Sequence, residues 1–231
     1  MTEPVLLITG SSSGMGLATA KLAAASGYRV ALAARRADVV EAEAAALGGP
    51  DKAIGIACDV SDWDQVQAMV ATTLDAFGRI DGVFANAGAF TEPGWKTDPV
   101  EVWKTNALVN VYGTAITARA AMDALIESKG KLILTSSRAA RFMVPGSFYA
   151  CTKAAVTAMG ESLRLEFNDT GAHVCVIEPG WVNTPMAASV PNLPDSIVEA
   201  ENIAAAVMFV MTMPPNADVN QILIRATTQP V

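Results

Sequence analysis

The sequence is poor in the residues that form metal centres and disulfide frameworks. Its 231 residues include one histidine and three cysteines, Cys58, Cys151 and Cys175, which have no CxxC spacing. An odd number of scattered cysteines does not make a disulfide framework, and a single histidine cannot build a histidine-rich metal site. We therefore expect neither a structural disulfide nor a bound metal ion.

Positive charge and long apolar runs are also scarce. The 16 Lys and Arg residues are outnumbered by 23 Asp and Glu, so the formal net charge is -7 and we expect no nucleic-acid partner. The longest apolar stretch, Ile203 to Met213, is shorter than the about 20 residues that cross a bilayer. The first residues have no basic, signal-like run. These absences predict a cytoplasmic protein with no membrane partner.

Apolar residues make up 52% of the chain, enough to fill a large core. Short apolar runs, typical of strands buried on both faces, alternate with longer helical patterns. The expected strands are Val5 to Ile8, Arg29 to Ala34, Ala53 to Ala57, Gly82 to Ala85, Lys131 to Thr135, His173 to Ile177 and Gln221 to Ile224. The expected helices are Met15 to Ala25, Trp63 to Phe77, Val102 to Glu127, Ala150 to Asn168 and Ile203 to Met213. This alternation predicts a single doubly wound Rossmann-type α/β domain over residues 1–231, with about seven parallel strands and helices on both faces.

One long segment interrupts the alternation. Between Thr184 and Glu201, Pro185, Pro191 and Pro194 exclude a continuous helix. Loops of this length in compact domains are more often functional than not. We expect a short substrate lid around residues 184–201, with an ordinary loop as the alternative.

A glycine-rich turn, Thr9 to Gly16, directly follows the first expected strand and opens a helix. Gly10 permits a tight turn, Gly14 lets the backbone approach a pyrophosphate, and Gly16 removes a side chain where helix meets sheet. The free N–H groups of the helix N-terminus would bind the phosphates. No lysine follows Gly16, so the turn is not that of a nucleotide triphosphatase. The turn favours dinucleotide binding, although glycine can also serve such a turn for steric reasons alone.

Two adjacent arginines, Arg35 and Arg36, follow the second expected strand after Ala34, where an acidic residue would bind a ribose 2′-hydroxyl. Arginine binds phosphate through paired hydrogen bonds. The pair predicts that NADP(H) is preferred over NAD(H), with a solvated surface pair as the alternative.

Tyr149 and Lys153 stand four residues apart at the start of an expected helix and therefore share one face. A phenol needs its pKa lowered by about 3 units to act as a base near neutral pH, and a nearby ammonium group favours that change. Ser136 and Ser137 close the strand before this helix, at the edge of the sheet where ligands of open α/β sheets bind.

Taken in order, these motifs make the chain resemble the short-chain dehydrogenase/reductase family over nearly its whole length. The matching motifs are TGxxxGxG at Thr9 to Gly16, NAG at Asn86 to Gly88, a helix asparagine at Asn110, the serine, YxxxK at Tyr149 to Lys153, and PGxxxT at Pro179 to Thr184. The resemblance implies hydride transfer between a nicotinamide dinucleotide and an alcohol or carbonyl.

The resemblance also implies roles for individual residues. Tyr149 would be the general acid/base, Lys153 would lower its pKa and hold the nicotinamide ribose, and Ser137 would bind the substrate oxygen. Asn110 would position a water in the proton relay. The interval from Ser137 to Tyr149 is one residue shorter than is common in the family, so Ser136 is the alternative serine.

The remaining positions carried over from the family concern the two ligands. The cofactor-binding residues would be Gly10, Ser12, Ser13, Gly14, Met15, Gly16, Arg35, Arg36, Asp59, Val60, Asn86, Ala87, Gly88, Tyr149, Lys153, Pro179, Gly180, Val182 and Thr184. The substrate would be near Ala139 and Trp181. Arg138, beside the serine, would hold a substrate carboxylate or, as the alternative, point away into a surface salt bridge.

The leading hypothesis is an NADP(H)-preferring carbonyl reductase or alcohol dehydrogenase that acts on a small or medium substrate. The long helices resemble the family's pairing helices, which predicts a homodimer or homotetramer. A non-catalytic dinucleotide-binding or sensor protein is the alternative from another class. A sugar-nucleotide epimerase or dehydratase is a third, although too few residues follow Thr184 for its larger substrate domain.

Overall fold

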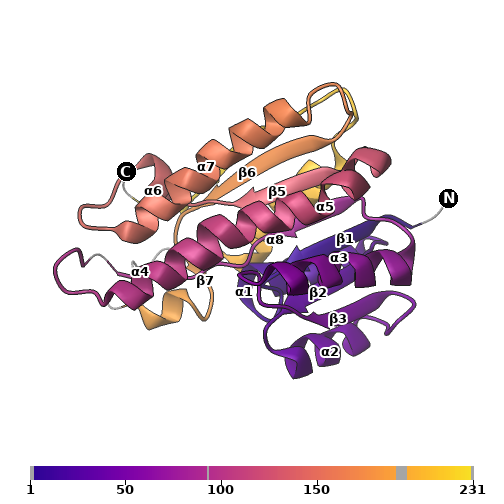
Figure 1. Ribbon diagram of the computed structural model, residues 1–231, viewed down its shortest axis with the longest axis horizontal. Helices are drawn as coiled ribbons and strands as arrows, with labels where there is room; N and C mark the ends of the chain where they lie inside the picture. The colour runs from indigo at the N-terminus through magenta and orange to yellow at the C-terminus, as the bar shows by residue number, and fades with distance from the viewer. Residues whose placement is uncertain (1–2, 93, 191–196, 230–231) are drawn as a thin grey trace.

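The computed structural model describes residues 3–92, 94–190 and 197–229. Seven parallel strands form the central sheet in the order β3-β2-β1-β4-β5-β6-β9 (Figure 1). The strands are β1 (Val5–Thr9), β2 (Arg29–Ala34), β3 (Ala53–Ala57), β4 (Gly82–Ala85), β5 (Lys131–Thr135), β6 (His173–Pro179) and β9 (Gln221–Ile224). The strand order reverses between β1 and β4, and the predicted doubly wound fold is confirmed.

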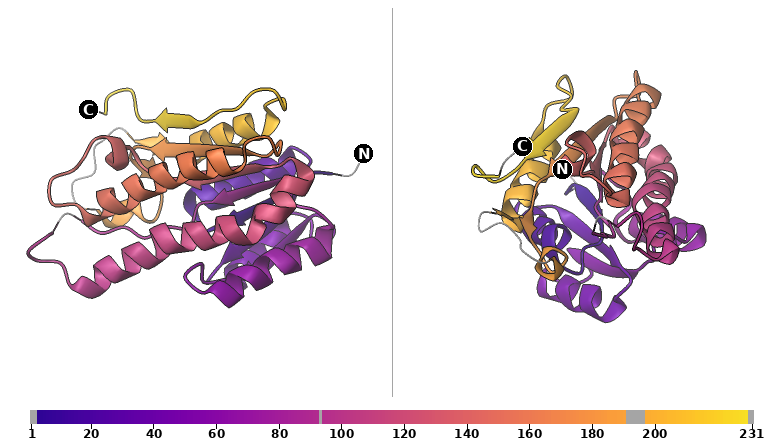
Figure 2. Two further views of the ribbon diagram at one scale, coloured as in Figure 1. Left: turned by 45° about the horizontal axis from the view of Figure 1, so that its top comes forward. Right: turned by 90° about the vertical axis from the view of Figure 1, so that its left-hand side faces the viewer.

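Helices cover both faces of this sheet, as the views in Figure 2 show. One face carries α1 (Gly14–Ala25), α2 (Ala37–Ala46) and α8 (Ala200–Thr212). The other carries α3 (Trp63–Phe77), the continuous run α4 (Val100–Asn106), η1 (Ala107–Gly113) and α5 (Thr114–Ser128), and α7 (Phe148–Glu166). The short helix α6 (Arg138–Arg141) follows β5.

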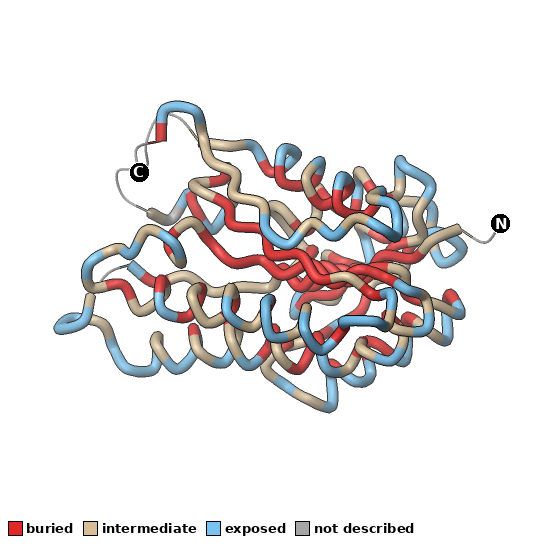
Figure 3. The backbone as a smooth tube through the Cα atoms, turned by 90° about the horizontal axis from the view of Figure 1, so that it is seen from above, coloured by how far each residue is buried: buried red, intermediate tan, exposed pale blue. Residues whose placement is uncertain are grey.

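The strands are apolar because both of their faces are covered. In β1, Leu7 packs into the core under α3, α5 and α7, whereas its neighbours Leu6 and Ile8 pack into the core under α1, α2 and α8. All three side chains are fully buried. Figure 3 shows that the buried residues, in red, run through the centre of the molecule. A parallel sheet covered on both faces therefore shows continuous apolar runs rather than alternation.

The expected helix from Val102 to Glu127 contains a π-helical turn, η1, that the sequence pattern did not predict. Gly113 ends this turn and packs against the loop after β3, where a Cβ would lie 2.9 Å from Val60 Cγ2 and 3.0 Å from its carbonyl oxygen. Thr114 Oγ1 donates to the Asn110 carbonyl at 2.7 Å. This wider turn contains Asn110, and π-helical turns are frequent at functional sites.

The expected lid is described only at its two ends, since residues 191–196 lie outside the described residues. Its ends are held together by two short parallel strands, β7 (Val182–Asn183) and β8 (Val198–Glu199), which pair Val182 with Val198. The short 3₁₀ helix η2 (Ala187–Ser189) lies between them. Within the described ranges, no helix is both long and apolar enough to span a membrane.

Candidate active site

Two cavities adjoin at the carboxyl ends of the strands, on either side of the point where the strand order reverses. One, of about 390 Å³, is lined by the glycine-rich turn and by the residues after β2, β3 and β4. The other, of about 350 Å³, lies between the end of β5, the start of α7 and the segment after β6. Met15, Asn86, Gly88 and Thr184 are among the residues that line both. A ligand that occupies the first cavity can therefore reach into the second.

The glycine-rich turn presents backbone rather than side chains to the first cavity. Gly10 adopts a φ of +65°, which L side chains rarely adopt. A Cβ on Gly16 would lie 2.5 Å from the Gly10 carbonyl oxygen, so only glycine lets α1 approach β1 this closely. Ser13, the N-cap of α1, makes no side-chain capping hydrogen bond, and the first turn contains no acidic residue. The free N–H groups of this helix end thus form an anion-binding site.

Polar side chains lie beside the glycine-rich turn in this cavity. Arg36 Nη2 donates to Ser12 Oγ at 3.0 Å and to its carbonyl oxygen at 3.3 Å, which holds the guanidinium over the glycine-rich turn. Arg35 is exposed beside it. Two hydrogen bonds from Ser61 lower the pKa of Asp59, and the positive charge of Arg35 lowers it further. Asp59 is therefore an ionised acceptor at the edge of the cavity.

Asn86 joins β4 to the glycine-rich turn. Its Nδ2 donates to the carbonyl oxygens of Thr9 and Gly10 at 3.1 and 3.3 Å, and Thr9 Oγ1 accepts from the backbone N–H of Asn86 and of Ala87. These bonds fix the position of Asn86, which lines both cavities. They also show Asn86 holding the sheet together beside the predicted cofactor.

Tyr149 and Lys153 lie in the first turns of α7, which Ser147 caps by accepting from the N–H of Ala150 at 3.1 Å. Lys153 Nζ lies 5.8 Å from the centre of the Tyr149 ring and donates to the Thr135 carbonyl at 2.7 Å. Burial raises the pKa of Tyr149 to about 12, although a hydrogen bond with Ser137 opposes the rise. Burial also lowers the pKa of Lys153 to about 8. Desolvation of Tyr149 thus outweighs its hydrogen bond with Ser137, and the lowering of the phenol pKa by Lys153 and the nicotinamide stays a prediction.

The two serines after β5 have different environments. Ser136 is buried, and its Oγ donates to the Lys153 carbonyl at 2.8 Å and lies 2.7 Å from Thr157 Oγ1. Ser137 Oγ accepts from the N–H of Ala139 at 3.1 Å and bonds Tyr149. The Ser137 hydroxyl is therefore the one beside the phenol, while that of Ser136 joins α7 to the sheet.

Asn110 lies beneath the site and lines neither cavity. Its Oδ1 accepts from the N–H of Ala89 at 2.8 Å, and its Nδ2 donates to the Ala89 carbonyl at 2.9 Å and to Thr152 Oγ1 at 3.0 Å. A Cβ on Gly88 would lie 3.5 Å from Asn110 Oδ1 and 3.6 Å from Lys153 Nζ. Gly88 is thus close to the side chains of both Asn110 and Lys153.

The predicted cofactor residues divide between the two cavities. The first is lined by Gly10, Ser12, Ser13, Gly14, Met15, Arg35, Arg36, Asp59, Val60, Asn86, Ala87, Gly88 and Thr184. The second is lined by Tyr149, Lys153, Pro179, Gly180 and Val182, together with the predicted substrate residues Arg138, Ala139 and Trp181. Gly16 lines neither and is buried against Gly10, Ser11 and Asn86.

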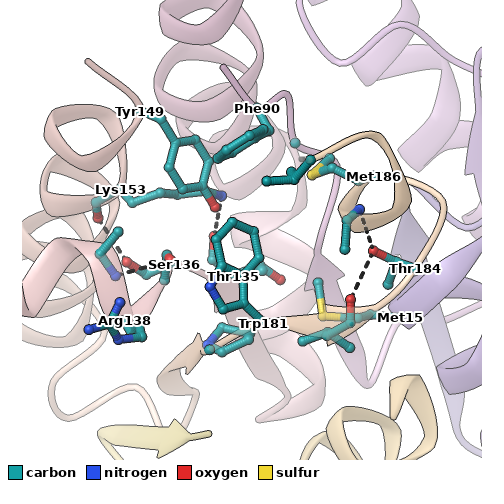
Figure 4. A pocket seen from close by; sticks show the side chains of 18 of the residues that line it. Met15, Phe90, Thr135, Ser136, Arg138, Tyr149, Lys153, Trp181, Thr184 and Met186 are labelled. Carbon is teal, nitrogen blue, oxygen red and sulfur yellow. Dashed lines mark hydrogen bonds between the residues drawn. The ribbon is translucent and has the colours of Figure 1, made fainter. Parts of the chain in front are cut away.

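Aromatic side chains form one wall of the second cavity (Figure 4). Phe90 packs edge-on against Tyr149, with ring centres 5.0 Å apart, and edge-on against Trp181 at 6.0 Å. Met186 and Val190 line this cavity from the segment predicted as a substrate lid, whereas Val144 and Gln229 were not among the predicted residues. Gln229 is close to the C-terminus, and no motif marks it.

Comparison with known proteins decides the family. The family model for short chain dehydrogenases matches residues 4–193. The chain belongs to the short-chain dehydrogenase/reductase family. It is 32% identical over 225 residues to an oxidoreductase of Staphylococcus epidermidis, covering 96% of this chain and 97% of that protein. As a member of this family the chain is an oxidoreductase with a fold that binds a nicotinamide dinucleotide.

Solved structures agree with this assignment. An alcohol dehydrogenase from the archaeon Thermococcus sibiricus, complexed with 5-hydroxy-NADP, is 29% identical with a TM-score of 0.92, and the alignment covers 99% of each chain. A 3-ketoacyl-(acyl-carrier-protein) reductase from Brucella melitensis, complexed with NADH, is 25% identical with a TM-score of 0.87, covering 96% of this chain and 97% of that one.

Proposed function

We propose that this oxidoreductase prefers NADP(H) and transfers hydride between the nicotinamide and a small or medium carbonyl compound or secondary alcohol, with Tyr149 as general acid/base. The observation that carries the proposal is the contact of Tyr149 with Ser137 and Lys153 in a cavity that adjoins the glycine-rich turn. A sensor protein that only bound the dinucleotide would not need this group of side chains beside its ligand.

The residues of the first cavity suit a dinucleotide phosphate. The uncapped N-terminus of α1 offers backbone donors to a pyrophosphate, and no side chain obstructs it at Gly10, Gly14 or Gly16. Arg36 is already oriented over this turn by Ser12, and Arg35 stands next to it. Two guanidinium groups at this end favour a ribose 2′-phosphate over a free hydroxyl. The Thermococcus enzyme holds an NADP derivative and the Brucella reductase holds NADH, so the preference must be measured.

The site residues are arranged for proton transfer. When bound, the reduced dinucleotide supplies the hydride that adds to the carbonyl carbon. Tyr149, protonated at neutral pH because its pKa is about 12, gives its proton to the carbonyl oxygen, while Ser137 donates a hydrogen bond to the same oxygen. Lys153, whose positive charge lies 5.8 Å from the phenol ring, stabilises the phenolate that remains. Asn110 is a positioning residue that holds the loop at Ala89 against α7.

The second cavity suits a compact substrate with an apolar part. Its volume of about 350 Å³ is at the small end of ligand pockets, and Phe90 and Trp181 supply flat apolar walls. We propose that a carrier-bound acyl chain, the substrate named for the Brucella reductase, is not the preferred one.

A substrate panel tests the proposal. Small aryl and cyclic ketones, and an acyl-carrier substrate, are offered to the purified enzyme while the absorbance of NADPH is followed. We expect the ketones to be reduced faster. Preference for the carrier-bound substrate would overturn the assignment of the cavity, and no oxidation of NADPH by any carbonyl compound would overturn the proposed activity.

We propose further that the chain forms a homodimer or homotetramer. Leu108 and Tyr112 on η1 and Leu165 on α7 are apolar and exposed, which suits helices that pair with another copy. Light scattering of the purified protein gives the mass directly, and a monomer would contradict the proposal.

A further inference from the structure

In keeping with the proposed function, the first cavity is called the dinucleotide cavity and the second the substrate cavity. The substrate cavity has a charged end that the proposed hydride chemistry does not use. Arg138 directly follows Ser137 and lines this cavity. In Figure 4 it lies on the opposite side of the cavity from Met186, which also lines the dinucleotide cavity. In the same view Met15 and Thr184 lie on the side of Met186, so the guanidinium lies at the end of the cavity away from the glycine-rich turn.

Arg138 has no ionic partner in the part of the chain that the structure describes. None of the ion pairs there includes it, and its Nε is buried without a hydrogen-bond acceptor. Its guanidinium rests over the Phe142 ring, with 5.6 Å between the guanidinium carbon and the ring centre. A buried donor without a partner is costly, so the site is incomplete without an acceptor.

A second unpaired guanidinium lies against the same ring. Arg225, just after β9, has its guanidinium carbon 5.6 Å from the centre of Phe142, and its Nη1 is buried without a partner. The buried carboxylate of Glu178 on β6 pairs with Arg141 at 2.7 Å. Two like charges on one ring, neither of them in an ion pair among the described residues, create a local positive potential on a protein of net charge -7.

The other polar groups of the cavity suit an anion at this end. Gln229 Oε1 accepts from the N–H of Trp181 at 3.4 Å, which leaves the two Nε2 donors for another partner. Lys153, at the catalytic end, is bound to Thr135. Glu92 also lines the cavity but is exposed and does not pair with Arg138.

From this geometry we infer that Arg138 binds a carboxylate of the substrate, so that the enzyme acts on short oxo acids and hydroxy acids. The inference rests on the proposed function and specifies its substrate class. The carbonyl or hydroxyl group would lie at Tyr149 and Ser137, and the carboxylate at the guanidinium of Arg138. A guanidinium fork binds a carboxylate through two parallel hydrogen bonds, which fixes the position of the reacting carbon.

Matched substrates test the inference. Oxo acids of increasing chain length are compared with their methyl esters in NADPH oxidation. We expect the wild-type kcat/KM to favour the best acid over its ester by about ten- to a hundredfold. Arg138→Met should bring this ratio close to one, and Arg138→Lys should give an intermediate ratio because it keeps the charge but not the fork. Arg119→Met, which removes an exposed guanidinium of α5 near Trp63, should leave the ratio as in the wild type.

A binding measurement separates this inference from the proposed activity. Isothermal titration with a short alkanoate and the matching alkanamide needs no turnover, and the melting temperature shows whether Arg138→Met is folded. We expect the alkanoate to bind wild type more tightly than the amide, and Arg138→Met to lose the difference. If esters are reduced as well as acids and the alkanoate has no advantage, the carboxylate inference is wrong although the reductase activity stands. If the alkanoate binds through Arg138 but no carbonyl compound is reduced, the carboxylate site stands and the proposed activity fails.

Discussion

The two cavities at the carboxyl edge of the sheet are built in different ways. The dinucleotide cavity consists largely of backbone: a turn with three glycines, a helix N-terminus and the loop after β4, all close to β1 and β4. The substrate cavity consists largely of side chains that come from distant parts of the chain, from Met15 to Gln229. The backbone part of the first cavity depends on glycines whose close approaches leave no room for a Cβ, whereas the second cavity can change its ligand when single side chains change. We therefore expect the substrate to be determined by the second cavity.

The proposed catalytic side chains lie where the two cavities meet. Tyr149 and Lys153 line the substrate cavity. The loop from Asn86 to Gly88, which lines the dinucleotide cavity, comes close to Lys153, since a Cβ on Gly88 would lie 3.6 Å from its Nζ. Changes at this boundary should therefore affect turnover, while changes deep in either cavity should affect one ligand only.

The largest expected effect is at this boundary. Tyr149→Phe removes one hydroxyl and keeps the ring that packs against Phe90, so the fold should be retained while the proton donor is lost. We expect kcat to fall by about 10² to 10⁴-fold. Steady-state kinetics with saturating substrate measures this, with circular dichroism as the control for folding. Wild-type turnover in this variant would contradict the assignment of Tyr149.

The next effect concerns the dinucleotide cavity alone. A charge-assisted contact with a 2′-phosphate is worth about 1.5 to 3 kcal/mol, so wild type should prefer NADPH over NADH in kcat/KM by about 10- to 150-fold. Arg35→Ala should erase most of this preference and leave the KM of the carbonyl substrate almost unchanged. Arg119→Ala, a matched change on the exposed side of α5, should keep the preference. A wild-type enzyme that prefers NADH would mean that the arginines serve another purpose.

The dinucleotide side could be predicted from the sequence because its signals are local. The glycine spacing, the apolar run before it and the arginines after β2 each lie within a few residues, and five of the seven strand boundaries coincide with the predicted ones. The helix α2 was not among the predicted helices, since its run of alanine and glutamate carries little apolar periodicity and only Val40 and Ala44 are buried.

The substrate side could not be predicted to the same depth. Gln229 and Val144 reach the cavity only through the tertiary fold, so no spacing in the sequence connects them. The choice between Ser136 and Ser137 likewise needed the structure, because both follow β5 and only their partners distinguish them. Nor did the sequence predict the raised pKa of Tyr149, which depends on the burial of the phenol.

A pH profile tests the roles of Tyr149 and Lys153 at the boundary between the two cavities. Because the pKa of Tyr149 is raised to about 12, the proton donor stays protonated through the neutral and mildly alkaline range. The pKa of Lys153 is lowered to about 8, so its positive charge is present below that pH and is lost as the pH rises through it. We expect carbonyl reduction to decline above about pH 8, by up to about tenfold per pH unit. A rate that stays level from pH 8 into the range where Tyr149 titrates would contradict a role for the lysine charge.

The smallest expected effect tests whether Gln229 contributes to the substrate cavity alone. Gln229→Ala removes the acceptor for the Trp181 N–H, a long hydrogen bond of 3.4 Å, and part of the cavity wall. A hydrogen bond of this kind contributes about 0.5 to 1.5 kcal/mol, so the KM for the carbonyl substrate should rise by roughly two- to tenfold. The KM for NADPH should not change, because Gln229 does not line the dinucleotide cavity. Gln221→Ala, at an exposed glutamine of β9 that bonds Arg141, is the matched control and should change neither constant. Equal shifts for both ligands would show that the two cavities are not independent.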